Sequence, residues 1–167
     1  MKLAKRVAQE FRTSRTLAVE KVENHVWVSD TYIAVKFNFQ EFKDFKEKYN
    51  SYKTTIDIPK FSKLLKIKGD KVKKLDEELM EAVIPEDNQL DYELKVTKEV
   101  QALVGKKGIR KLKNNELGDV YIAREYEFLL ENAMDGYELY TAGNLSPVAL
   151  VENSRISCLI MPVRNAG

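Results

Sequence analysis

One supersecondary unit recurs along this chain, and that recurrence constrains the fold more than any other feature of the sequence. The unit is β-α-β-β-β, and residues 119–161 predict it whole. Its opening strand and helix are also predicted at 54–66, and a helix followed by three strands is predicted at 2–39. Recurrence of one unit within 167 residues indicates internal duplication. Helices laid against antiparallel strands define an α+β fold class.

The complete unit sets out its elements clearly. Its first strand is expected at 119–123, its helix at 124–134, and its last three strands at 136–141, 147–151 and 155–161. Clusters of turn-forming residues at 142–144 and 152–154 separate those strands.

The segments between the recurring parts are predicted one by one. Residues 40–52 carry aromatic side chains at helical spacing, which fits either a short helix or an ordered loop. Pro59 predicts the first turn of a helix that reaches residue 66. Residues 70–84 predict a further amphipathic helix, and 89–97 alternate as a strand. The basic stretch 106–115 indicates a hairpin or a loop.

Residues 2–13 predict an amphipathic helix with an unusually basic polar side. Leu3, Val7 and Phe11 recur on its apolar side. The polar side carries the cations Lys2, Lys5, Arg6 and Arg12, and its only acidic residue is Glu10. This side is either a solvated surface or a surface that faces phosphate groups.

Charge and composition exclude several classes of protein. The 28 lysines and arginines against 26 acidic residues leave a net charge of +2, which excludes a histone-like blanket of positive charge. No apolar run approaches the roughly 20 residues of a membrane span. The N-terminus lacks the apolar core of a secretory signal. A cytoplasmic protein that does not contact membranes is therefore expected.

The residues that carry enzyme chemistry are scarce. One Cys and one His are too few for a zinc site. His25 is predicted at a strand end on the surface rather than as a general base, and Cys158 in an apolar run as a buried, inert thiol rather than a reactive one. No Gly-rich phosphate loop or nucleophile elbow is present. We expect no catalysis and no cofactor.

Three stretches carry a resemblance to a known family. They are the strand and helix residues 119–133, then Leu145-Ser146-Pro147-Val148, then Leu159-Ile160-Met161-Pro162-Val163-Arg164. Their order and spacing resemble the C-terminal end of bacterial sliding clamps, the β subunits of the replicative polymerase. This chain resembles a reduced version, phage- or plasmid-encoded.

Two shorter stretches are similar to the same family. Residues 28–35 resemble a strand turn in which the family has Gly and Arg where this chain has Thr31 and Ile33. Residues 54–65 resemble a strand-helix junction. The resemblance implies a single clamp-like domain over 1–167, with repeat-like halves at about 2–65 and 118–164. Residues 66–117 match no part of the family and form an insertion.

The resemblance implies a processivity factor for DNA polymerase, in which a homo-oligomeric ring encircles double-stranded DNA without reading its sequence. A chain with two repeats would close such a ring as a hexamer, and one with three repeats as a tetramer. Lysines and arginines on the inner helices attract phosphates. The residues expected to face DNA are Lys2, Lys5, Arg6, Arg12, Lys60, Lys63 and Lys66. The helix at 124–134 fits that role poorly because it carries Glu125, Glu127 and Glu131.

The family also binds short hydrophobic peptides of the polymerase, the clamp loader and other partners beside its C-terminal tail. The matching positions are Pro147, Val148, Leu159, Met161, Pro162 and Val163. A flexible Met beside rigid Pro suits an adaptable peptide pocket, whereas Leu159 and Val163 fit ordinary strand packing equally well. The alternative function is a clamp-like regulator or decoy that binds replication proteins without encircling DNA.

Overall fold

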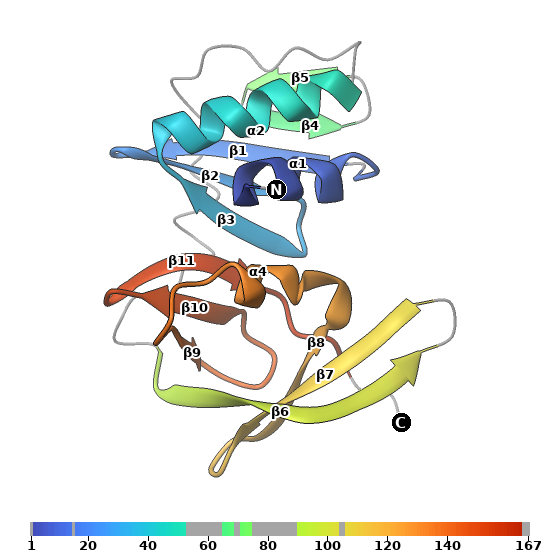
Figure 1. Cartoon of the computed structure of the whole chain (residues 1–167), viewed down its shortest axis with the longest axis vertical. Coiled ribbons are helices and arrows are strands. Elements are labelled where there is room, and N and C mark those ends of the chain that lie inside the picture. Colours follow the sequence, from blue (N-terminus) through green and yellow to red (C-terminus); the bar gives the residue numbers. More distant parts are fainter. Residues whose placement is uncertain are drawn as a thin grey trace. The chain divides into compact units, whose positions relative to one another are not determined.

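A computed structural model describes residues 2–14, 16–52, 65–68, 71–74, 90–103 and 106–164. The chain divides into two compact units, Met1–Ile84 and Pro85–Gly167. Figure 1 shows both units, and each is described by itself.

The first unit is an antiparallel sheet with two helices. Its elements are α1 (Leu3–Phe11), β1 (Thr16–Val22), β2 (His25–Ser29), β3 (Ile33–Phe37), α2 (Phe39–Tyr52), β4 (Leu65–Lys68) and β5 (Lys71–Lys74). The strands follow the order β5-β4-β1-β2-β3. Val28 of β2 lies opposite Val19 of β1 on one side and Val35 of β3 on the other. The predicted helix and three strands at 2–39 are confirmed.

The core of this unit joins α1 to α2, and α2 in turn packs on strands β2 and β3. Helix α1 buries Ala4, Val7, Ala8 and Phe11, and α2 buries Phe42, Phe45 and Tyr49. The ring of Phe45 lies 6.1 Å from that of Phe11 and 5.8 Å from that of Phe37 in β3. Phe45 of α2 therefore packs against both α1 and β3.

Residues 40–52 form the helix α2 rather than a loop because a capping box starts it. The Glu41 N–H donates to Asn38 Oδ1 over 2.8 Å, and the Asn38 N–H donates to Glu41 Oε1 over 3.0 Å. These reciprocal bonds satisfy donors that the first turn of a helix otherwise leaves unpaired.

The second unit contains the whole predicted β-α-β-β-β unit. Its elements are β6 (Tyr92–Leu103), β7 (Lys106–Asn114), β8 (Gly118–Ala123), the 3₁₀ helix η2 (Arg124–Tyr126), α4 (Phe128–Glu131), β9 (Glu138–Thr141), β10 (Val148–Glu152) and β11 (Arg155–Ile160). The antiparallel order is β11-β10-β9-β6-β7-β8. Strand β6 pairs with β9 near its start and with β7 over most of its length. The α+β fold class holds for both units.

The helix of this unit is shorter than the predicted 124–134. It consists of the 3₁₀ turn η2 followed by the single turn α4. The Asn132 side chain donates to the carbonyl of Phe128 over 2.7 Å, and Gly136 follows with a φ of 82°. A local side-chain bond and a left-handed glycine both favour the end of a helix.

Two helix predictions in the first unit are wrong where the structure describes them. Leu65–Lys68 and Lys71–Lys74 are strands that pair as a hairpin, with Lys68 opposite Lys71. Their sequences alternate apolar and basic residues around a Gly-Asp pair, which is the pattern of a hairpin with a two-residue loop. The remaining parts of the predicted helices at 59–66 and 70–84, and the strand at 54–58, lie outside the described residues.

Three further predictions concern single segments. The strand predicted at 89–97 is confirmed from Tyr92 onward as β6, which continues to Leu103. The basic stretch 106–115, expected to be a hairpin or a loop, is instead the single strand β7, which pairs with β6 and β8. His25 is half-buried at the start of β2. No helix in the described ranges has the length and apolar character needed to span a membrane.

Candidate nucleic-acid interface

The exposed side of α1 gathers positive charge. Lys2, Lys5 and Arg12 are exposed and Arg6 is half-buried, while the opposite side of the helix is buried in the core. The first turn contains no acidic residue. We call the side that carries Lys2, Lys5, Arg6 and Arg12 the α1 face.

The cations of the α1 face differ in how firmly the protein holds them. Arg6 forms an ion pair with Glu10, with Nη1 and Oε2 3.3 Å apart. Arg12 donates from Nη1 to the carbonyl of Gln9 over 2.9 Å. Lys2 and Lys5 form no ion pair with any residue in the described part of the chain. These two lysines are the cations most readily available to an external anion.

Helix α2 packs beside α1 but adds no net charge to it. Its sequence balances three acidic residues against three lysines. Two of the lysines also lie over rings of their own helix, Lys46 over Phe42 and Lys48 over Tyr52. The positive charge of the helical layer is therefore concentrated on the α1 face.

The turn between β2 and β3 lies beside the end of α1. Asp30 is buried and accepts hydrogen bonds from the N–H groups of Tyr32 and Ile33, each over 2.9 Å. Burial raises the pKa of Asp30, whereas these bonds and a hydrogen bond with the Ser14 side chain lower it, with a net rise. Ser14 lies three residues beyond the end of α1, and its N–H donates to the Phe11 carbonyl over 3.0 Å, so the turn lies close to the end of that helix.

The other residues expected to face DNA are not brought to the α1 face by the described structure. Lys60 and Lys63 lie outside the described residues. Lys66 lies in strand β4 rather than in the predicted helix, and its strand pairs with β1, where Lys66 is opposite Ala18.

The predicted peptide-pocket residues separate into two groups. Val148 and Leu159 are buried within β10 and β11, where Val148 lies opposite Ile160 and Leu159 opposite Ala149. This burial is the ordinary strand packing that the sequence left open for Leu159. Met161 is exposed, and the remaining three, Pro147, Pro162 and Val163, are half-buried.

The C-terminal segment returns to the edge of β8. The Val163 N–H donates to the carbonyl of Tyr121 over 2.8 Å, and the two residues form an isolated antiparallel bridge. Covering an edge strand in this way blocks part of a surface that could otherwise pair with another chain.

The helical segment of the second unit is acidic, as the sequence indicated. Glu127 is paired with Arg110, with Oε1 and Nε 2.5 Å apart, and also lies 3.4 Å from Arg124. Glu125 is half-buried and Glu131 is exposed. The charge of this segment is therefore opposite in sign to that of the α1 face.

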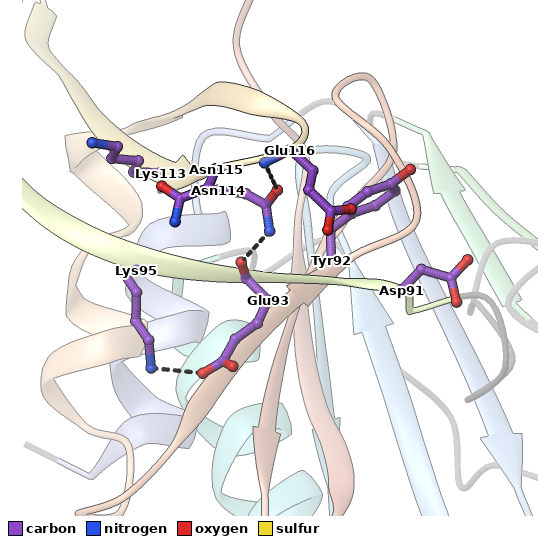
Figure 2. Close-up of a pocket in the computed structure, with 8 residues that line it drawn as sticks. All are labelled: Asp91, Tyr92, Glu93, Lys95, Lys113, Asn114, Asn115 and Glu116. Carbon is purple, nitrogen blue, oxygen red and sulfur yellow. Dashed lines mark hydrogen bonds and ion pairs between the residues drawn. The ribbon is translucent and has the colours of Figure 1, made fainter.

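A polar depression of about 420 Å³ lies where β6 begins and β7 turns into β8. Figure 2 shows Asn114 at its centre, donating to the Glu93 carbonyl over 2.8 Å and accepting from the Glu116 N–H over 2.9 Å. Lys95 is paired with Glu93, with Nζ and Oε1 2.6 Å apart. The complete lining is Asp91, Tyr92, Glu93, Lys95, Lys113, Asn114, Asn115 and Glu116.

Neither this depression nor the exposed turn at Tyr32 was predicted from the sequence. The Asn-Asn-Glu turn at 114–116 and the Ser-Asp-Thr turn at 29–31 were visible signals. Both turns depend on Asn or Asp side chains that bond to the backbone two or three residues further on.

The thiol of Cys158 is fully enclosed in the second unit. Burial raises its pKa to about 12, and the charge of Glu152 acts in the same direction. The thiolate that nucleophilic or redox chemistry needs is therefore strongly disfavoured. Among the described residues, no cluster of His, Cys, Asp and Glu side chains has the arrangement of a metal site.

Comparison with protein families, with curated proteins and with solved structures finds no match for this chain.

Proposed function

We propose that this protein is a clamp-like processivity factor that binds double-stranded DNA without reading its sequence and tethers replication proteins. The observation that carries the proposal is the α1 face, where four cations and one acidic residue lie on the exposed side of a helix whose other side is buried. Lysine and arginine on such a surface bind phosphates, and phosphate contacts position a protein on DNA without specifying a sequence.

The order of the elements supports the same proposal. The second unit has the order β-α-β-β-β, and the first has a helix followed by three antiparallel strands. Thr31 adds a local observation, because its φ is 84° at a position where the family has glycine. A left-handed backbone is what glycine accommodates without strain.

The physical mechanism requires loose binding. Lys2 and Lys5 are not committed to ion pairs in the described structure, so their ammonium groups can exchange one phosphate for the next through water. Such contacts attract the duplex and permit sliding, since none of them depends on a base edge.

A second candidate function is a clamp-like regulator that binds replication proteins without encircling DNA. The acidic η2–α4 segment favours it, because Glu125 and Glu131 would repel phosphates if that helix faced DNA.

Sedimentation combined with a topological assay separates the two functions. A processivity factor forms a closed homo-oligomer that, once loaded, is retained on nicked circular DNA and lost when the circle is linearised. A monomer or dimer across the micromolar range, with no preference for circular DNA, would overturn the ring and leave the regulator.

A further inference from the structure

Tyr32 is the most exposed large apolar side chain in the described residues, with 61% of its surface accessible. Among the described residues, no aromatic ring and no Lys or Arg side chain packs against the ring of Tyr32. Phe39 is also exposed in this unit, but Lys21 lies over its ring with Nζ 5.4 Å from the centroid. Most of the Tyr32 side chain is therefore accessible to an external partner.

The backbone holds Tyr32 outward at a cost. The preceding Thr31 has a φ of 84°, which is strained for a β-branched residue. The turn keeps this conformation because Asp30 accepts from the N–H groups of residues 32 and 33, and Ser29 Oγ accepts from the Thr31 N–H over 3.1 Å. Because the turn is already rigid, it loses little conformational entropy when a ligand stacks on the aromatic ring that it presents.

The position of the turn indicates what would stack there. Ser14 lies three residues beyond the end of α1, where its N–H donates to the Phe11 carbonyl over 3.0 Å. Its side chain lies close enough to Asp30 to lower the pKa of that carboxyl, so the turn lies near the end of the helix that carries the α1 face. Figure 1 shows α1 ending near the edge of the sheet where β2 leads into β3. An exposed aromatic ring near a cationic surface fits a nucleobase whose phosphate is held by the cations.

We propose that Tyr32 stacks on an unpaired base and gives the protein affinity for single-stranded DNA next to the duplex. Bases within a duplex are stacked on one another, so only an unpaired base offers its face to Tyr32. This inference rests on the proposed function, because the cations of the α1 face would hold the phosphates that flank the base.

Fluorescence anisotropy with a labelled oligo-dT strand and a labelled blunt duplex tests the proposal. Tyr32→Ala should weaken oligo-dT binding by roughly 5- to 140-fold, the equivalent of about 1–3 kcal/mol of stacking per base. Tyr32→Phe keeps the ring and should bind oligo-dT like the wild type. Duplex affinity should not change in either variant. The matched control Phe39→Ala removes an exposed ring elsewhere in the same unit and should leave both affinities unchanged.

The outcomes distinguish this inference from the proposed function. If Tyr32→Ala binds oligo-dT as tightly as the wild type, the stacking role is wrong, whatever the duplex data show. If Phe39→Ala weakens oligo-dT binding as much as Tyr32→Ala, a general surface effect replaces the assigned site. Reversing Lys2 and Lys5 to Glu tests only the proposed function. Its effect on duplex binding says nothing about the stacking role of Tyr32.

Discussion

The rings of Phe11 and Phe45 meet edge to face, with centroids 6.1 Å apart and planes inclined by 77°. Phe11 ends α1 and Phe45 lies at the middle of α2, so this contact fixes the helix with the cationic face against its neighbour. Both side chains are fully buried.

Phe45→Ala should therefore destabilise the first unit severely. The substitution removes a ring that contacts Phe11, Phe37, Phe42 and Tyr49. A cavity of that kind costs about 3–5 kcal/mol. Urea denaturation followed by circular dichroism measures the loss. Phe45→Leu, which refills part of the cavity, should recover part of the stability, and equal midpoints for the two variants would contradict this packing.

Asp30 should respond differently to Asn and to Ala. Asp30→Ala leaves the N–H groups of Tyr32 and Ile33 without their acceptor, which costs about 1–3 kcal/mol. Asp30→Asn retains an acceptor oxygen and avoids burying a charge. Thermal unfolding at pH 7 should place Asp30→Asn at or above the wild type, and both well above Asp30→Ala.

The pH dependence of stability follows from the raised pKa of Asp30. Below the ordinary value of 3.8 the carboxyl is protonated in both the folded and unfolded states. As the pH rises above 3.8 the unfolded state loses this proton first, so the Asp30 contribution to stability falls until the folded carboxyl has also ionised. In Asp30→Asn this loss of stability with rising pH should be absent. If the free energy of unfolding of the variant followed the same pH profile as the wild type, the role assigned to Asp30 would be wrong.

Thr31→Gly should stabilise the protein. The strain of a left-handed Thr is about 1–2 kcal/mol, and the extra backbone entropy of glycine offsets about 0.5–1 kcal/mol of the gain. The net increase in the free energy of unfolding is thus about 0.5–1 kcal/mol. Thr31→Ala keeps a Cβ, so it should not show this increase in the free energy of unfolding. A lower unfolding midpoint for Thr31→Gly than for Thr31→Ala would show that the turn is not strained.

The Arg110 side chain joins β7 to β6 and to the residue that follows η2. Its Nε lies 2.5 Å from Glu127 Oε1, and its Nη1 donates to the Thr97 carbonyl over 3.1 Å. Arg110→Met should cost about 1.5–3 kcal/mol because it removes charge-assisted bonds at a mostly buried position. Lys95→Met breaks the exposed pair with Glu93 and should leave the unfolding midpoint unchanged. Equal shifts of the unfolding midpoint for Arg110→Met and Lys95→Met would contradict the larger contribution assigned to the more buried pair.

Several elements could be predicted from the sequence because their signals are local. The alternation and turn residues of 136–161 located β9, β10 and β11 to within two residues. The hairpin at Leu65–Lys74 was missed because short runs of alternating Lys and apolar residues also fit helical spacing. The shortening of the helix after β8 depends on how Asn132 bonds to Phe128, which spacing does not reveal.

The candidate site was predictable only in part. Helical spacing alone places Lys2, Lys5, Arg6 and Arg12 together on the α1 face. A motif does not show which side of a strand faces the core, so Val148 and Leu159 could not be assigned to packing from the sequence. The exposure of Tyr32 depends on the hydrogen bonds that Asp30 accepts from the N–H groups of Tyr32 and Ile33, which the sequence pattern does not reveal.

The salt dependence of duplex DNA binding tests the central claim most directly. Each phosphate contact contributes about 0.9 to the slope of log K against log salt concentration. Reversing Lys2 and Lys5 together to Glu should reduce that slope by about 1.8 and weaken binding to every duplex sequence alike. The control reverses Lys98 and Lys107, two exposed lysines of the second unit, with the same change in net charge. If the α1 face binds phosphates, the slope of log K against log salt concentration falls only in the variant with Lys2 and Lys5 reversed. Equal slopes in the wild type and both variants would contradict the account.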